Sequence, residues 1–163
     1  MKWLIAVLVA LLLAWFVRHE RQAVKSAYVN GLPQYNTLPG REYIFQQDCY
    51  IFKYKDRATD WPLVAAHATV PELPAEVTER NVGAALPNVR ILDVVRTGAH
   101  FRIVSVRRDE SGQGTTVTFE ILFLDEAERK YPRLDAYEMI DHPADSDHDV
   151  PAFRREYAAP WVM

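Results

Sequence analysis

Apolar and polar residues alternate most regularly between positions 100 and 124. The segments 100–107 and 115–124 alternate with a period of two, and a polar, glycine-containing stretch separates them. This pattern predicts a β-hairpin. One face of the second segment carries four apolar side chains, those of Val117, Phe119, Ile121 and Phe123. We therefore expect Phe119 and Ile121 in the hydrophobic core, and Glu120 on the opposite face.

The first segment of this hairpin changes phase in its middle. Phe101 and Ile103 occupy odd positions, whereas Val104 and Val106 occupy even positions. One inserted residue shifts the alternation of a strand by one position. The sequence therefore predicts a β-bulge near Ile103.

Other strands are predicted on both sides of the hairpin. In the segment 49–55, Tyr50, Phe52 and Tyr54 share one face, while Ile51 and two lysines share the other. Further candidates are strands at 41–45 and 88–95, a short helix at 74–80, and a strand or short helix at 134–140. Many short strands and little helix predict a mainly β fold. The nearest architecture is a small antiparallel barrel or sandwich, SH3-like by pattern alone.

The N-terminal segment 3–17 is apolar on every side and contains no Gly or Pro. As a helix it would be roughly 22 Å long. Lys2 and Arg18 could extend to the two membrane surfaces, and Trp3 and Trp15 suit the two interfaces. We predict an uncleaved single-pass transmembrane anchor at 1–17, with the membrane bound through 3–17.

A cleaved signal peptide is the alternative for this segment. The charged residues 18–21 follow the apolar run where small neutral residues are needed for cleavage, and the first tolerable site precedes Ala27. Lys and Arg are more numerous after the apolar segment than before it. This distribution slightly favours a cytoplasmic position for the rest of the chain.

The remaining chain divides into three predicted parts. We expect a stalk at 18–39, a β-rich domain at 40–141 and an acidic, aromatic tail at 142–163. The formal net charge of −3 gives no strong global field for nucleic acid. The chain has one cysteine, Cys49, and so no intramolecular disulfide framework.

Cys49 follows Asp48 in a predicted strand, and no histidine is close to it in the sequence. A nucleophilic thiol needs a nearby base and a lowered pKa. The pattern therefore favours an inert strand cysteine over a catalytic one.

The tail has a partial match to a calcium loop. Asp145, Asp147 and Asp149 stand at the first, third and fifth positions, and Glu156 at the twelfth. The turn position is Val150 instead of Gly, and the flanks do not resemble a helix pair. A solvated acidic loop is the favoured interpretation, with these four residues as weak metal candidates.

Basic residues could form a stripe on the sheet, and aromatic residues nearby could stack on bases. The stripe would contain Lys53, Lys55, Arg90, Arg96, Arg102, Arg107 and Arg108. The alternation places the aromatic residues of 49–55 on the face opposite the lysines. This arrangement therefore disfavours nucleic acid as a partner.

No phosphate loop, CxxC pair, HExxH or GxSxG motif is present, and no cofactor is indicated. We predict a membrane-tethered, non-enzymatic module that binds another protein. One alternative is an exported β-domain that binds a cell-wall or small-molecule ligand after signal cleavage. Another is an enzyme without a recognisable motif, with His67, His100 and Asp48 among its candidate residues.

Overall fold

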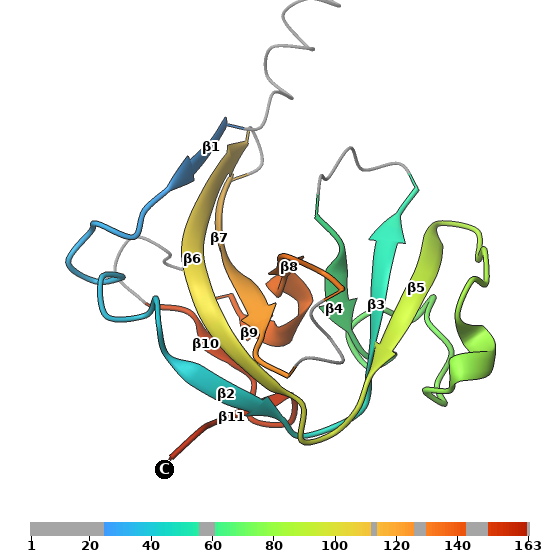
Figure 1. Ribbon diagram of the computed structural model, residues 1–163. Helices are drawn as coiled ribbons and strands as arrows, with labels where there is room; N and C mark the ends of the chain where they lie inside the picture. Colours follow the sequence, from blue (N-terminus) through green and yellow to red (C-terminus); the bar gives the residue numbers. More distant parts are fainter. Residues whose placement is uncertain (1–24, 56–60, 112–113, 126–129, 143–149, 163) are drawn as a thin grey trace, which may run out of the picture.

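The computed structural model describes residues 25–55, 61–111, 114–125, 130–142 and 150–162 (Figure 1). The predicted mainly β fold is confirmed. The strands are β1 (Lys25–Tyr28), β2 (Glu42–Phe45), β3 (Cys49–Tyr54), β4 (Leu63–Ala65), β5 (Val89–Val95), β6 (His100–Ser111), β7 (Gly114–Phe123), β8 (Leu134–Asp135), β9 (Ile140–Asp141), β10 (Ala152–Phe153) and β11 (Ala158–Pro160). Two short 3₁₀ helices are described, η1 (Glu79–Asn81) and η3 (Tyr137–Met139).

The main sheet has nine strands, in the order β11-β2-β6-β7-β8-β4-β3-β5, with β1 also paired to β6. Strand β6 is long and curved, so that one of its edges holds two strands (Figure 1). β2 pairs with residues 100–102, and β1 pairs with residues 107–110. β9 and β10 form a separate two-stranded sheet.

The sheet is not closed into a barrel, so the predicted barrel is wrong. Closure would need the end strands β5 and β11 to pair with each other. The outer edge of β5 is occupied instead, because Gly83 N donates to Ile91 O and Ile91 N donates to Ala84 O. β11 ends at Pro160, which has no N–H to donate.

The central hairpin forms as predicted, with β6 and β7 paired over most of their length. The predicted bulge is confirmed, because the register shifts between Ile103 and Ser105. Val104 is the extra residue. The shift lets both Ile103 and Val106 enter the core, and it turns Ser105 to the other face.

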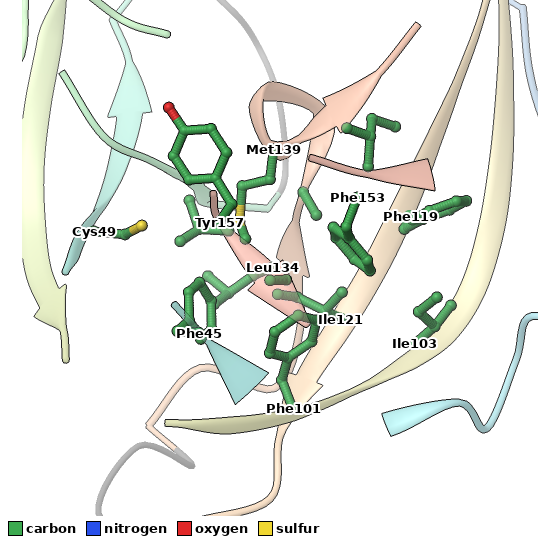
Figure 2. Close-up of a cluster of buried hydrophobic side chains, with 14 of the residues drawn as sticks. Phe45, Cys49, Phe101, Ile103, Phe119, Ile121, Leu134, Met139, Phe153 and Tyr157 are labelled. Atoms are coloured by element: carbon green, nitrogen blue, oxygen red, sulfur yellow. The ribbon is translucent and has the colours of Figure 1, made fainter. Parts of the chain in front are cut away.

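Phe119 and Ile121 are 1% and 0% exposed, which confirms their predicted burial. They lie in the larger of two buried clusters, beside Phe153 and Leu134 (Figure 2). The second cluster lies on the other face of β3, β4 and β5. It contains Tyr50, Phe52, Leu63, Ala65, Val70, Leu73, Val89 and Ile91.

The predicted helix at 74–80 is absent, and the structure has only η1 in this region. The buried Tyr50 side chain is the physical reason. Its hydroxyl donates to Glu76 O at 2.5 Å and accepts from Asn81 Nδ2 at 2.6 Å. Thr78 is consequently extended, with φ −133°. The last candidate segment, 134–140, divides into β8, η3 and the start of β9.

The sheet and its core extend beyond the predicted limits of 40 and 141. Residues assigned to the stalk form β1, and Tyr35 and Leu38 are buried in the main core. From the predicted tail, β11 joins the sheet and Tyr157 is 0% exposed. Described residues on both flanks therefore contribute strands and core side chains to the domain.

No helix among the described residues is long and apolar enough to cross a membrane. The predicted anchor at 1–17 lies outside the described residues. None of the described helices is thus the expected single-pass helix. The anchor and its orientation stay predictions from the sequence.

Candidate functional site

The face of β6, β7 and β8 opposite the main core carries polar side chains that are nevertheless buried. The register places Ser105, Glu120 and Asp135 side by side across these three strands. They are 5%, 0% and 5% exposed. In the neighbouring row, Arg107 lies between Tyr28 of β1 and a threonine of β7. A buried carboxylate requires compensation by hydrogen bonds or opposite charge.

Glu120 receives that compensation at both of its oxygens. Oε2 accepts hydrogen bonds from Ser105 Oγ at 2.5 Å and from Arg133 Nη1 at 3.0 Å. Oε1 accepts one from the Tyr28 hydroxyl at 3.1 Å and lies 3.5 Å from Arg107 Nη1. Four side chains, from β1, β6 and the residue before β8, thus meet on one carboxylate.

Asp135 is compensated in the same way. Arg107 Nη2 lies 2.7 Å from Asp135 Oδ2, and Thr118 Oγ1 donates to Oδ1 at 2.6 Å. Arg107 also binds Asp109 through Nε at 3.1 Å. Burial lowers the pKa of Arg107, but the hydrogen bond to Asp109 and the charges of both aspartates outweigh it and raise the pKa above its ordinary value. The guanidinium is therefore a permanent cation in this network.

Two of the side chains that bind Glu120 also reach solvent. Tyr28 is 58% exposed, and the Arg133 side chain is 43% exposed. The Arg133 guanidinium lies 5.9 Å from the centre of the Trp61 ring. Burial of the hydroxyl, and then the charge of Glu120, raise the pKa of Tyr28, so the hydroxyl stays a donor at neutral pH. We call Tyr28, Arg133 and Trp61 the aromatic–arginine patch.

The geometry of Glu120 is unsuited to acid–base catalysis. A general acid or base needs an oxygen within reach of the proton that it transfers. Both oxygens of Glu120 already have two close partners, and the residue is inaccessible to solvent. Its carboxylate fixes the position of the side chains around it.

The three residues considered for a motif-free enzyme make separate contacts. Asp48 accepts from Thr97 N at 2.8 Å, and this hydrogen bond, which outweighs burial, holds the pKa of Asp48 below its ordinary value. His67 contacts the carbonyl oxygen of Leu73. His100 instead lies against Trp161 and 3.7 Å from a carboxylate oxygen of Glu42. These contacts do not form a catalytic constellation.

Cys49 is 0% exposed and lies in the main core (Figure 2). Burial, with a smaller effect from the charge of Asp48, raises the pKa of the thiol to about 12. The thiolate is the reactive form of cysteine. The thiol is therefore unreactive near neutral pH.

We expect Cys49 to resist iodoacetamide in the folded protein at pH 8, because the thiol is both protonated and inaccessible. In denaturant it should react at the rate of an ordinary cysteine. Intact-mass measurement reports the alkylation of Cys49 alone, since the chain has a single cysteine. Rapid alkylation of the folded protein would show that the thiol is activated and accessible.

Acidic partners accompany several residues of the predicted basic stripe. The ion pairs are Arg96 with Asp48 and Glu79, Arg102 with Glu42, Arg107 with Asp109 and Asp135, and Arg108 with Glu110. Lys53 and Arg90 are cross-strand neighbours on β3 and β5, and Lys55 follows β3. Tyr50 and Phe52 are buried in the second cluster, where no base can stack on them. These two rings therefore cannot provide a stacking platform for bases beside the stripe.

The calcium candidates are described only in part. Asp145, Asp147 and Asp149 lie outside the described residues, whereas Glu156 lies in the turn between β10 and β11. Within the described ranges, no group of three or more His, Cys, Asp or Glu side chains could hold a metal ion. The calcium loop thus stays an untested hypothesis.

The sequence did not identify the aromatic–arginine patch or the carboxylates behind it. Alternation correctly placed Glu120 opposite the core, but it did not reveal what covers that face. The hydrogen bond from Tyr28 spans 92 positions, and the one from Arg133 depends on β8.

No protein-family model, no curated protein and no solved structure matches this chain.

Proposed function

We propose that this domain is a non-enzymatic protein-interaction module and that the aromatic–arginine patch is its contact surface. One observation carries the proposal. The exposed side chains of Tyr28 and Arg133 both bind the same inaccessible carboxylate, that of Glu120. An ordinary exposed Tyr or Arg would move freely among rotamers.

The composition of the patch supports this function. Tyr, Trp and Arg are the residue types most enriched among the side chains that dominate binding energy at protein interfaces. Their immobilisation on binding normally costs about 0.5–1.5 kcal/mol for each side chain. Hydrogen bonds to Glu120 fix Tyr28 and Arg133 before a partner arrives, so this cost is reduced.

The surrounding charges also suit an interface. Arg107 and Arg133 oppose the buried carboxylates, and the hairpin tip adds Arg108 and Glu110 as a pair. The patch therefore presents planar side chains without a strong excess of one charge. Such a surface favours a polypeptide partner over a polyanion.

A photocrosslinking amino acid at position 132 tests this proposal in the native host. Pro132 is exposed and adjacent to Arg133, but it is not part of the patch. We expect a discrete crosslinked product from the full-length protein. Tyr28→Ala and Arg133→Ala should each weaken partner binding by ~2 kcal/mol or more and so reduce the yield strongly.

Two controls accompany that experiment. The same crosslinker at Val82, which is 39% exposed beside β5, should not give this product. Arg80→Ala removes an exposed arginine on η1 and should leave the yield unchanged. No product from position 132, or a product that survives both patch substitutions, would contradict the proposed contact surface.

A further inference from the structure

Strand β1 has an edge that is open among the described residues. Among the described strands it pairs only with β6, and all four of its residues are exposed. Val29 N donates to Val106 O at 3.0 Å, so the backbone of Val29 faces β6. Alternate residues of an antiparallel strand direct their hydrogen-bonding groups to opposite sides. Ser26 and Tyr28 therefore direct their backbone N–H and C=O groups away from β6.

The other end strands of the main sheet are protected, whereas no described residue covers the outer edge of β1. Residues 83–85 cover the outer edge of β5, and Pro160 removes a donor from β11. Proteins commonly block exposed sheet edges in these ways, because open edges pair with other chains. β1 contains no proline, and its only charged residue is Lys25, at its start.

The inner side of β1 is held firmly. The Tyr28 hydroxyl binds Glu120 at 3.1 Å, and Asn30 Oδ1 accepts from Val106 N at 2.6 Å. Val29, directly after the strand, is 9% exposed in the main core. The open edge is thus ordered before any partner binds, which lowers the entropic cost of binding.

We propose that β1 accepts an extended segment of a partner protein as an additional strand. This inference rests on the proposed function and deepens it by giving the class of partner. The backbone groups of Ser26 and Tyr28 would supply the hydrogen bonds, as in other cases of strand addition. An acidic side chain of the segment would lie near Lys25, and an apolar one against the exposed ring of Tyr28.

A second copy of this chain is a poorer occupant. β1 has four residues, so pairing it with itself would bury far less than the ~1,200–2,000 Å² of a stable interface. A transient complex with an extended segment requires less buried area. The inference therefore commits to a segment of another protein.

Peptides selected from a displayed library of random sequences against the full-length protein provide the probe. The key variant is Ser26→Pro, which removes an outward N–H, and the matched control is Ser26→Ala, which keeps it. Selected peptides should bind wild type and Ser26→Ala equally, and Ser26→Pro at least ~10-fold more weakly. Methylation of alternate backbone nitrogens in the peptide should abolish binding to wild type, and this test does not depend on the folding of a variant.

Hydrogen exchange gives a second measurement on the same peptides. In the free protein, the amides of Ser26 and Tyr28 should exchange rapidly, and those of Ala27 and Val29 should be protected. Saturating peptide should protect Ser26 and Tyr28 as well. Failure to select any peptide, equal binding to Ser26→Pro, or no new protection at these two amides would overturn strand addition.

Self-association of the protein that Ser26→Pro abolishes would also overturn the inference, because the occupant would then be a second copy. The two proposals fail differently. If the crosslink from position 132 depends on Tyr28 and Arg133 but Ser26→Pro has no effect, the interaction surface stands and strand addition fails.

Discussion

Replacing Phe119 with alanine should lower the free energy of unfolding by ~3–5 kcal/mol. Phe119 is 1% exposed in the middle of β7, and the centres of the Phe119 and Phe153 rings lie 5.2 Å apart. The substitution leaves a cavity that the surrounding side chains cannot fill. Urea unfolding of the full-length protein, followed by circular dichroism, measures the change.

Val82→Ala is the control for Phe119→Ala, because Val82 is 39% exposed and its truncation should change stability by less than ~0.5 kcal/mol. A Phe119→Ala protein with the midpoint of wild type would show that the core face of β7 is misassigned.

Glu120→Ala should be similarly destabilising, by ~3–5 kcal/mol, although Glu120 lies on the opposite face of β7. Its removal leaves Ser105 and the Tyr28 hydroxyl without their acceptor. It also removes one of the three carboxylates around Arg107, which keeps Asp109 and Asp135, and it leaves the Arg133 guanidinium without its carboxylate partner. The same unfolding experiment applies.

Glu79→Ala provides a matched comparison for Glu120→Ala. Glu79 pairs with Arg96, but its side chain is 78% exposed, and exposed ion pairs contribute only ~0–1 kcal/mol. The contrast between the two glutamates is therefore the expected result. Equal, small effects would mean that the buried network contributes no more to stability than a surface ion pair.

Phe119 and Glu120 also show how far the sequence predicts this fold. The alternation of β7 is local, so it correctly separated the two faces and placed Phe119 in the core. The phase change in β6 was equally local, and it predicted a bulge near Ile103, which the structure places at Val104. Such features depend on residues next to each other in the chain.

Features that depend on distant contacts were missed. The burial of Glu120 requires Tyr28, which lies 92 positions earlier in the chain, and Arg133, which lies directly before β8. The absence of the helix at 74–80 depends on Tyr50, whose hydroxyl binds that segment. Barrel closure is likewise a property of the whole sheet, since it depends on whether the end strands meet.

These contacts give the aromatic–arginine patch its distinguishing property, which is exposure combined with fixed geometry. The buried carboxylate of Glu120 costs free energy unless it is fully paired, so the pairing holds Tyr28 and Arg133 in place. If those side chains were mobile, the patch would be an ordinary part of the surface, and the case for a preorganised interface would fail.

Nitrogen-15 relaxation of the Arg133 Nε–H group in the full-length protein tests this claim most directly. Bound to Glu120 and lying beside Trp61, the guanidinium should have an order parameter near the ~0.85 of rigid backbone. Exposed arginines such as Arg80 serve as the internal reference and should be much less ordered. A value for Arg133 below ~0.6, like that of flexible groups, would contradict the account.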